Sequence, residues 1–174
     1  KNLFNSDGQI TDRALLRNPV KVKLPNGVDA VITGQINFEA GRIVAVTLKE
    51  PVKMKLTSGG FESLVTGDLN FNSDGQIVGL VTLSASKQID ISKGISMMTD
   101  QVEIQNGNIS RARVLKECTV QINNKEIKAT PGVFLTFTEL GEIKGISEIK
   151  GVYDEGSTKT FHYFTDDYEK NVGK

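Results

Sequence analysis

The chain of 174 residues is poor in the residue types that most often carry chemistry, with one cysteine, one histidine and no tryptophan. A single cysteine, Cys118, excludes an internal disulfide and leaves the redox compartment open. A single histidine, His162, excludes metal sites built from several histidines and makes any histidine-dependent triad rely on that residue alone. The lack of tryptophan, with only three tyrosines near the C-terminal end, argues against the aromatic platforms of sugar-binding sheets.

An excess of charge of one sign is also lacking, since Lys and Arg together number 21 and so do Asp and Glu. A formal net charge of zero provides no long-range attraction to nucleic acid or to an anionic membrane. Apolar runs are only a few residues long, so no segment predicts a membrane-spanning helix, and the first residues do not resemble a signal peptide. Neither a dinucleotide-binding nor a phosphate-binding glycine motif occurs.

What the sequence does contain is a repeated heptapeptide, F-N-S-D-G-Q-I, which begins at Phe4 and again at Phe71. Weaker copies keep an apolar residue, a polar turn, a glycine, any residue and then isoleucine. The glycines of the five copies are Gly8, Gly41, Gly75, Gly107 and Gly141, with steps of 33, 34, 32 and 34 residues. The sequence therefore predicts five units of about 33 residues.

Apolar and polar residues alternate within each predicted unit, which is the pattern of a half-buried strand. The alternation is clearest in two segments one unit apart, V-K-V-K-L from Val20 and V-K-M-K-L from Val52. Asp-Gly and Asn-Gly steps are typical of hairpin turns. Each unit thus predicts three or more short antiparallel strands: one that ends at the turn, a return strand and a strand of the V-K-M-K-L type. We expect the polar residue after each glycine to face water as a spacer: Gln9, Arg42, Gln76, Asn108 and Glu142.

About fourteen short strands without a helix must cover their own apolar faces. For residues 1–151 we therefore predict an all-β fold, an antiparallel meander of five units closed as a barrel or as a two-layer sheet. A three-stranded propeller blade and a parallel solenoid are less favoured alternatives. Residues 152–174 predict a capping strand, F-H-Y-F from Phe161, followed by a polar tail. Residue 1 falls inside a unit, which suggests either a piece of a longer protein or a mature chain that has lost its export signal.

The candidates for catalysis or metal binding have simpler structural explanations. We interpret His162 and Cys118 as packing residues of strands. The segment N-F-N-S-D-G from Asn70 has part of a calcium-loop pattern, but Val81 stands where the bidentate glutamate belongs, so the segment predicts a turn. An enzyme would need carboxylates to converge, and the candidates lie close to the C-terminus: Asp154, Glu155, Asp166 and Asp167. We predict that the chain is not an enzyme and has no metal and no cofactor.

Two sets of residues are candidates for binding. The lysines on the alternating segments predict either a small basic patch or ordinary solvated side chains: Lys21, Lys23, Lys53 and Lys55. The apolar residues that open four of the turns predict either a filled interior or the lining of an apolar cavity: Phe38, Phe71, Ile104 and Phe137.

Each predicted unit consists of F-x-x-x-G-x-I, a return strand and V-K-x-x-L-x-x-G. This unit resembles the short hairpin repeats of exported bacterial proteins and looks like a looser relative of YwqK-type and MORN-type repeats. The resemblance extends to about Gly151 and departs from MORN repeats in its longer period and missing Tyr-x-Gly pattern. It implies a periplasmic, outer-surface or secreted protein whose export signal or lipid anchor has been removed.

The function that this resemblance implies is that of a non-enzymatic structural or adhesin-like surface. Its partner would be another protein or an envelope component, not nucleic acid. The alternative function, from the predicted closed sheet, is that of a carrier that holds a small apolar ligand in its interior.

Overall fold

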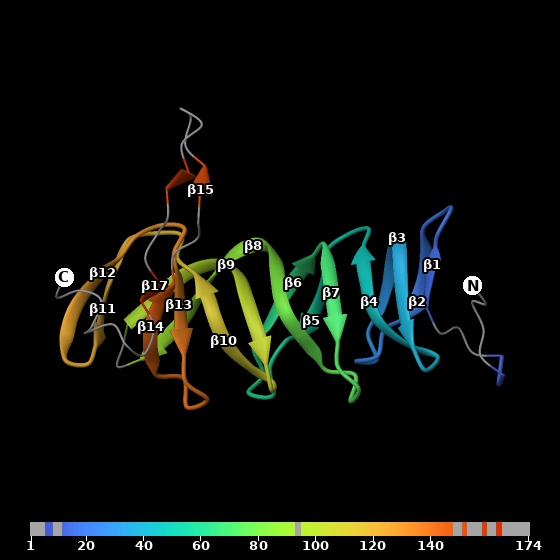
Figure 1. The fold of residues 1–174 in the computed structure, drawn as a ribbon, viewed down its shortest axis with the longest axis horizontal. Helices are drawn as coiled ribbons and strands as arrows, with labels where there is room; N and C mark the ends of the chain where they lie inside the picture. Colours follow the sequence, from blue (N-terminus) through green and yellow to red (C-terminus); the bar gives the residue numbers. More distant parts are fainter. Residues whose placement is uncertain are drawn as a thin grey trace. The chain divides into compact units, whose positions relative to one another are not determined.

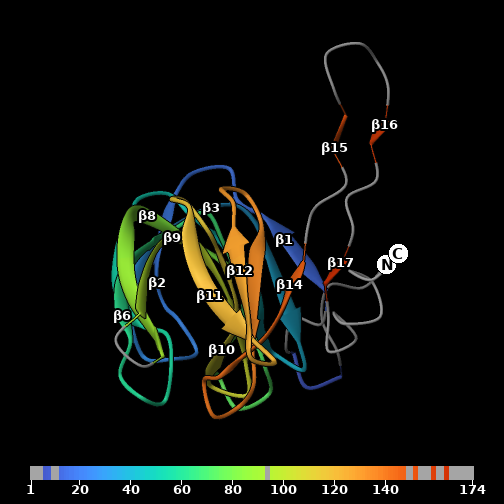
Figure 2. The ribbon, with the colours of Figure 1, turned by 90° about the vertical axis from the view of Figure 1, so that its left-hand side faces the viewer.

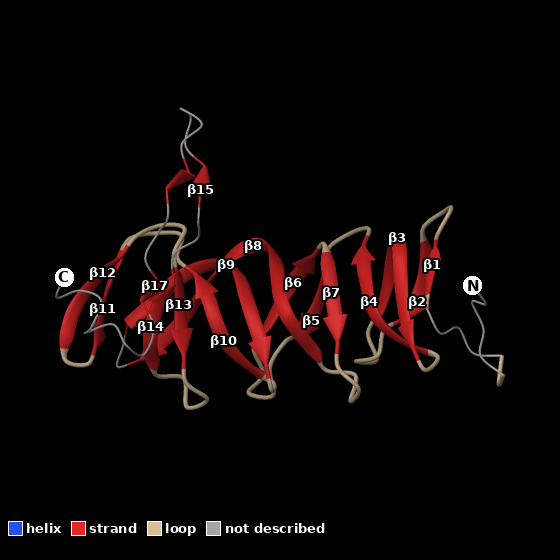
Figure 3. Ribbon diagram, in the orientation of Figure 1, coloured by secondary structure: helices blue, strands red, loops and turns tan. Residues whose placement is uncertain are grey.

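A computed structural model of the chain describes residues 6–8, 12–92 and 95–147, with the pairs 151–152, 158–159 and 163–164. This part of the chain consists of strands and turns and contains no helix (Figures 1 and 3). The all-β fold class that we expected is therefore confirmed. The strands are β1 (Arg13–Leu15), β2 (Val20–Lys23), β3 (Asp29–Glu39), β4 (Arg42–Leu48), β5 (Val52–Lys55), β6 (Glu62–Thr66), β7 (Asp68–Phe71), β8 (Ile77–Ser92), β9 (Ile95–Gln105), β10 (Asn108–Arg113), β11 (Cys118–Ile122), β12 (Lys125–Ala129), β13 (Phe134–Phe137), β14 (Ile143–Ser147), β15 (Gly151–Val152), β16 (Thr158–Lys159) and β17 (Tyr163–Phe164).

The chain divides into two compact units. Unit 1 comprises Lys1–Ala85 and Glu103–Asn108, and unit 2 comprises Ser86–Val102 and Ile109–Lys174. In unit 1 the strand order is β1-β3-β4-β7-β8, with β2 beside β3 and with the β5–β6 pair joined to β8 through β6. Neighbouring strands are antiparallel, so the predicted meander is confirmed.

Strand β3 has a bulge at Gly34, where its register with β4 shifts between Thr33 and Asn37, and a bulge of this kind bends a strand. The first part of β3 pairs with β2, and the part beyond Gly34 pairs with β1. Gly34 has φ 68° and Gly67, between β6 and β7, has φ 74°, a backbone conformation that is open to glycine and costly for other residues. Figure 2 shows β2 and β6 on one side of unit 1 and β1 on the other. The two parts of a bent strand can therefore cover the core from two sides.

Three strand pairs share the same register. Arg13 of β1 lies opposite Asn37, and Ala45 of β4 lies opposite Asn70. The amide of Leu16 donates to the carbonyl oxygen of Gly34 at 2.8 Å, and the amide of Leu48 donates to that of Gly67 at 2.9 Å. In unit 2 the β10–β13 pair has the corresponding partners Arg111 opposite Thr136 and a 2.8 Å bond from the amide of Val114 to the carbonyl oxygen of Val133.

The core of unit 1 consists of alternate residues from its strands, as a half-buried sheet requires. Their side chains are at most 5% exposed: Leu24, Ala30, Ile32, Ile36, Val46, Leu48, Met54, Leu56, Val65, Leu69, Phe71, Ile77, Val81, Leu83 and Ile104. The residues between them in the same strands are mostly exposed or half-buried and polar. The apolar–polar alternation therefore identified the buried face.

In unit 2 the strand order is β8-β9-β10-β13-β14-β17, while β11 and β12 form a hairpin of their own and β15 pairs with β16. Among the described residues, Thr99 is the one buried polar side chain. Its hydroxyl donates to the carbonyl oxygen of Gln101 at 2.9 Å and accepts from the amide of the same residue at 3.3 Å. Thr99 is thus satisfied within its own strand, as a buried hydroxyl must be.

Two details of the predicted architecture are wrong. The barrel is wrong, because in the described residues the paired strands follow an open path from β1 to β17. Bent strands already cover the core from two sides, so closure is not required. The third predicted unit does not break into short strands, since β8 is 16 residues long. Pro19 lies between β1 and β2, and Pro51 lies between β4 and β5. No proline stands at the corresponding place in β8, so nothing of this kind interrupts the strand.

The predicted C-terminal cap lies largely outside the described residues. Of the F-H-Y-F segment, Tyr163 and Phe164 form β17, which pairs with β14 through Ile146 and Ser147. His162 and the carboxylates of Asp154, Glu155, Asp166 and Asp167 lie outside the described residues.

Candidate functional site

The hairpin tips β3–β4 and β7–β8 point toward the same edge of unit 1 (bottom of Figure 1). The β7–β8 tip is held together by Asn72, whose Oδ1 accepts from the amides of Asp74 at 3.0 Å and Gln76 at 2.9 Å. Asn72 therefore satisfies donors that a five-residue turn would leave to water. The sequence from Asn70 forms the end of β7 and this turn, as predicted.

Glycines in two tips lie directly against another turn of unit 1. A Cβ atom at Gly75 would be 2.8 Å from the carbonyl oxygen of Pro25, in the β2–β3 turn. A Cβ atom at Gly107 would meet Oγ of Ser58, in the β5–β6 turn, and the amide of Ser58 donates to the carbonyl oxygen of Gly107 at 2.9 Å. At Gly75 only glycine allows the two backbones to approach so closely, whereas at Gly107 the nearest atom belongs to the side chain of Ser58.

Two hollows lie on either side of the Pro25–Gly75 contact, and we call them the tip hollows. The first has a volume of about 410 Å³ and is lined by Lys23, Pro25, Gly41, Arg42, Ile43, Asn72, Ser73, Asp74 and Gly75. The second has a volume of about 370 Å³ and is lined by Pro25, Asn26, Val28, Lys55, Leu56, Thr57, Ser58, Asp74, Gly75, Gln76, Ile77 and Gly107. The two are built in the same way: an edge-strand lysine faces two hairpin tips in each.

The charged groups of the tip hollows alternate in sign. Lys23 and Arg42 line the first hollow, Asp74 lines both, and Lys55 lines the second. Nη1 of Arg42 donates to the carbonyl oxygen of Ser73 at 2.7 Å, which ties the β3–β4 tip to the β7–β8 tip and leaves the other guanidinium donors for a ligand. The part of the chain that the structure describes holds no ion pair to Lys23 or Lys55.

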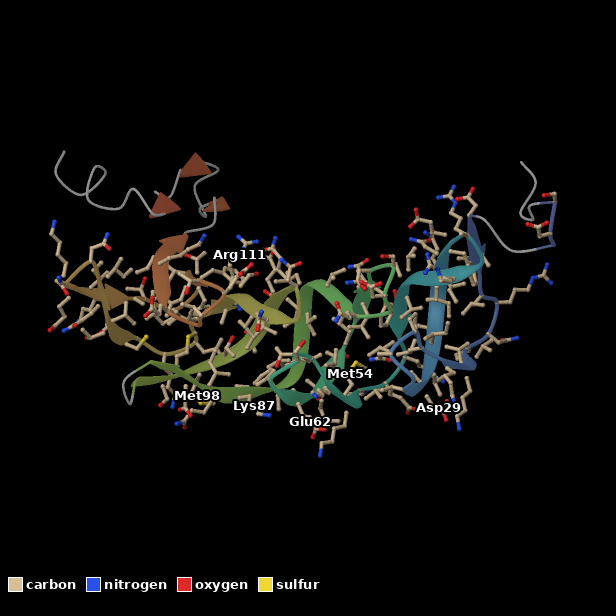
Figure 4. All side chains as sticks on the ribbon, turned by 90° about the horizontal axis from the view of Figure 1, so that it is seen from below. Asp29, Met54, Glu62, Lys87, Met98 and Arg111 are labelled. Atoms are coloured by element: carbon tan, nitrogen blue, oxygen red, sulfur yellow. The ribbon has the colours of Figure 1, made fainter. Side chains whose placement is uncertain are left out.

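The structure divides the four predicted patch lysines into two kinds. All four are exposed on β2 and β5. Lys23 and Lys55 line the tip hollows, whereas Lys21 and Lys53 line neither, and Nζ of Lys53 lies 3.4 Å from a carboxylate oxygen of Glu62. Acidic side chains follow the same edge, and Figure 4 shows Asp29 and Glu62 on the outside of the ribbon. The lysines therefore do not form a continuous basic surface.

The predicted lining residues lie at the turns, as the sequence places them, but they line no tip hollow. Phe71 is 4%, Ile104 1% and Phe137 7% exposed, and all three are buried. Phe38 is half-buried. Phe38, Phe71 and Ile104 belong to unit 1 and Phe137 to unit 2.

A third hollow of about 290 Å³ lies on the outer face of β3, β4 and β7. Its polar side chains pair with one another: Nε2 of Gln35 donates to Oδ1 of Asn37 at 2.6 Å, and Oγ1 of Thr47 donates to Oδ1 of Asp68 at 2.6 Å. Much of its hydrogen-bonding capacity is therefore already used, in contrast to the lysines of the tip hollows.

The residues that sequence reasoning missed are Arg42 and Asp74. Arg42 follows Gly41 directly, and we expected it to be a solvated spacer; it does face solvent, but it also bonds to the next tip. Asp74 was considered only as part of a turn. The signal that could have identified them is the charge at a tip position, which becomes significant only when neighbouring tips are known to be adjacent.

Cys118 is half-buried at the start of β11, opposite Ala129. Burial raises the pKa of its thiol, which lowers the thiolate fraction at neutral pH. Within the described residues, no group of three or more His, Cys, Asp or Glu side chains is placed to hold a metal ion, and no helix has the length and apolar character to cross a membrane.

Comparisons with protein-family models, with curated proteins and with solved structures found no match to this chain.

Proposed function

We propose that the chain is a non-enzymatic β-repeat protein of the bacterial cell envelope or of the secreted fraction, which acts as an interaction surface for another protein or an envelope component. Five units of about 33 residues, related to exported hairpin repeats, are part of this proposal. Single copies of cysteine and histidine agree with a role that does not depend on side-chain chemistry.

The observation that carries the proposal is the common register of β1–β3, β4–β7 and β10–β13. Equivalent residues on these pairs alternate between inward apolar and outward positions, so the inward side chains are used for packing. The outward side chains differ from pair to pair, with Arg13 and Asn37, Ala45 and Asn70, and Arg111 and Thr136. A regular backbone that carries variable outward side chains supports a role in which the surface recognises a partner.

The test is site-specific photocrosslinking in the cells that produce the protein. A benzophenone amino acid replaces one exposed residue at a time: Lys23 and Lys55 at the tip hollows, Asn70 on the sheet face, and Lys21 and Lys53 away from both. We expect one discrete adduct that depends on the position of the probe and on light. Fractionation of the same cells should place the protein in the envelope or the medium.

The carrier alternative predicts a different result. Native mass spectrometry of the purified protein would then show the mass of the chain plus an apolar ligand, and no probe position would give a discrete adduct. This pair of results would overturn the proposed surface role. A bound mass is not expected under our proposal, because Phe71, Ile104 and Phe137 are nearly inaccessible to solvent.

A further inference from the structure

The tip hollows are the part of unit 1 where exposed cations surround a formed depression. Lys23 and Arg42 line one hollow and Lys55 the other, and neither lysine has an ion pair within the described residues. Lys53, on the same strand as Lys55, does pair with Glu62. The cations of the hollows therefore remain available to an anionic ligand.

The walls of the hollows are held in place by contacts that a ligand does not have to create. Gly75 lies against Pro25, Arg42 bonds to the carbonyl oxygen of Ser73, and Asn72 closes the β7–β8 turn. Ser58 bonds to Gly107 at the far end of the second hollow. A site that is already ordered loses little entropy when a ligand binds.

The distance between the two hollows determines the spacing between the charged groups of a ligand that binds both. The β3–β4 and β7–β8 hairpins are adjacent in the sheet, so their tips are two strands apart. Strands lie about 4.8 Å apart, which gives roughly 10 Å between successive tips. A polyproline II peptide has three residues per turn and rises about 3.1 Å per residue, so residues i and i+3 are on one face and about 9.3 Å apart. In a β-strand, residues i and i+3 point to opposite faces.

The sign of the charges favours a polypeptide over a uniform polyanion. Asp74 lines both hollows, between the cations of the first and Lys55 of the second. Its carboxylate would repel a ligand with continuous negative charge. The backbone of a polyproline II segment has no internal hydrogen bonds, so its amides can donate to Asp74 while its acidic side chains reach the lysines.

We propose that the two tip hollows bind an acidic segment of a partner protein in the polyproline II conformation, with carboxylates at positions i and i+3. One carboxylate binds Lys23 and Arg42, and the other binds Lys55. This inference rests on the proposed interaction function and names the surface and the chemistry of the partner.

The probe is a synthetic peptide with four Glu-Pro-Ser repeats, titrated into the protein at low salt and followed by the amide resonances of Gly41, Gly75 and Gly107. The matched peptide has the same composition with the four glutamates in one block. We expect saturable shifts with the spaced peptide and at least tenfold weaker binding of the blocked one. Salt should weaken binding, because exposed charges are screened.

Matched variants separate the hollows from the general charge of the edge. Lys23→Gln with Lys55→Gln should weaken binding of the spaced peptide at least tenfold. Lys21→Gln with Lys53→Gln removes the same charge from the same two strands and should change affinity less than threefold. Equal losses in the two double variants would overturn the proposal.

Two further results would also overturn it: no binding of the spaced peptide, or tighter binding of a heparin oligosaccharide that depends on Lys23 and Lys55. Neither result is the same as a failure of the proposed function. A discrete photocrosslink from Asn70 on the sheet face would leave the protein an interaction surface whose partner binds elsewhere.

Discussion

At the scale of the residue, the tips of unit 1 depend on glycines for a reason beyond the turn itself. Gly67 and Gly75 have almost the same backbone conformation, with φ 74° and 77°. A Cβ atom at Gly67 would meet no atom within 4 Å, whereas at Gly75 it would meet the backbone of Pro25. The two positions therefore separate the cost of the conformation from the cost of the contact.

We expect Gly75→Ala to destabilise the protein more than Gly67→Ala. Both variants place alanine in the left-handed region, which costs about 1–2 kcal/mol. Gly75→Ala must also displace the β2–β3 turn, and overpacking of this kind costs roughly 1–3 kcal/mol more. Urea unfolding of the two variants and the parent measures the difference. Equal urea midpoints for the two variants would show that the β2–β3 turn moves to accommodate the added Cβ atom without a loss of stability.

Cys118 provides a second test at this scale. Because burial raises the pKa of its thiol, alkylation by iodoacetamide at pH 7.5 should be slower in the folded protein than in urea. The folded state holds the thiol proton more tightly, so the contribution of the thiol to stability is complete below its ordinary pKa of about 8.5. It is lost as pH rises from there through the raised pKa of the folded state. Equal alkylation rates in both states would contradict the half-buried position.

At the scale of the element, the bend in the long strands is the feature that most changes the architecture. Gly34 and Gly67 occupy equivalent places in T-G-Q-I-N-F and T-G-D-L-N-F, and Asp100 follows Thr99 at the same place in β9. The carboxylate of Asp100 accepts from Nε of Arg113 at 2.8 Å and from Nη2 at 2.5 Å. This two-point bond raises the pKa of Arg113 and fixes β9 against β10 in unit 2.

We predict a measurable coupling energy for this pair. In a double-mutant cycle with Asp100→Asn and Arg113→Lys, the coupling should be about 1 kcal/mol, because the pair is bidentate and its side chains are only 28% and 34% exposed. The exposed pair of Lys53 and Glu62, at 3.4 Å, is the comparison and should give less than about 0.5 kcal/mol. A larger coupling energy for the exposed pair would contradict the prediction that the bidentate pair is the more stabilising one.

At the scale of the whole molecule, charge balance is the property that the sequence states directly. The formal net charge is zero at pH 7 and the isoelectric point is about 6.8. Repulsion between molecules is weakest near that pH, and association is then favoured. We expect a solubility minimum between about pH 6.5 and 7, with higher solubility at pH 5 and pH 9, measured by light scattering. A flat profile would indicate that interactions other than net charge control association.

The sequence by itself determined the turns, the buried face and most of the strands, but not the 16-residue strand β8. Alternation marked the inward residues, such as Met54 between Lys53 and Lys55, because a strand turns every second side chain to the same side. The glycines of F-N-S-D-G-Q-I and its copies marked the β3–β4, β7–β8, β9–β10 and β13–β14 hairpins. Both signals are local, so a single chain is enough to read them.

Only the tertiary structure decided how strands are shared and which side chains meet. Gly34 could be read as part of a pattern, but its bend, and hence the open sheet in place of a barrel, follows from pairings with β1 and β2 that are not local. Arg42 and Asp74 are 32 positions apart and were interpreted separately. They line one hollow because two hairpins stand side by side in the sheet, and that adjacency is a property of packing, not of either turn.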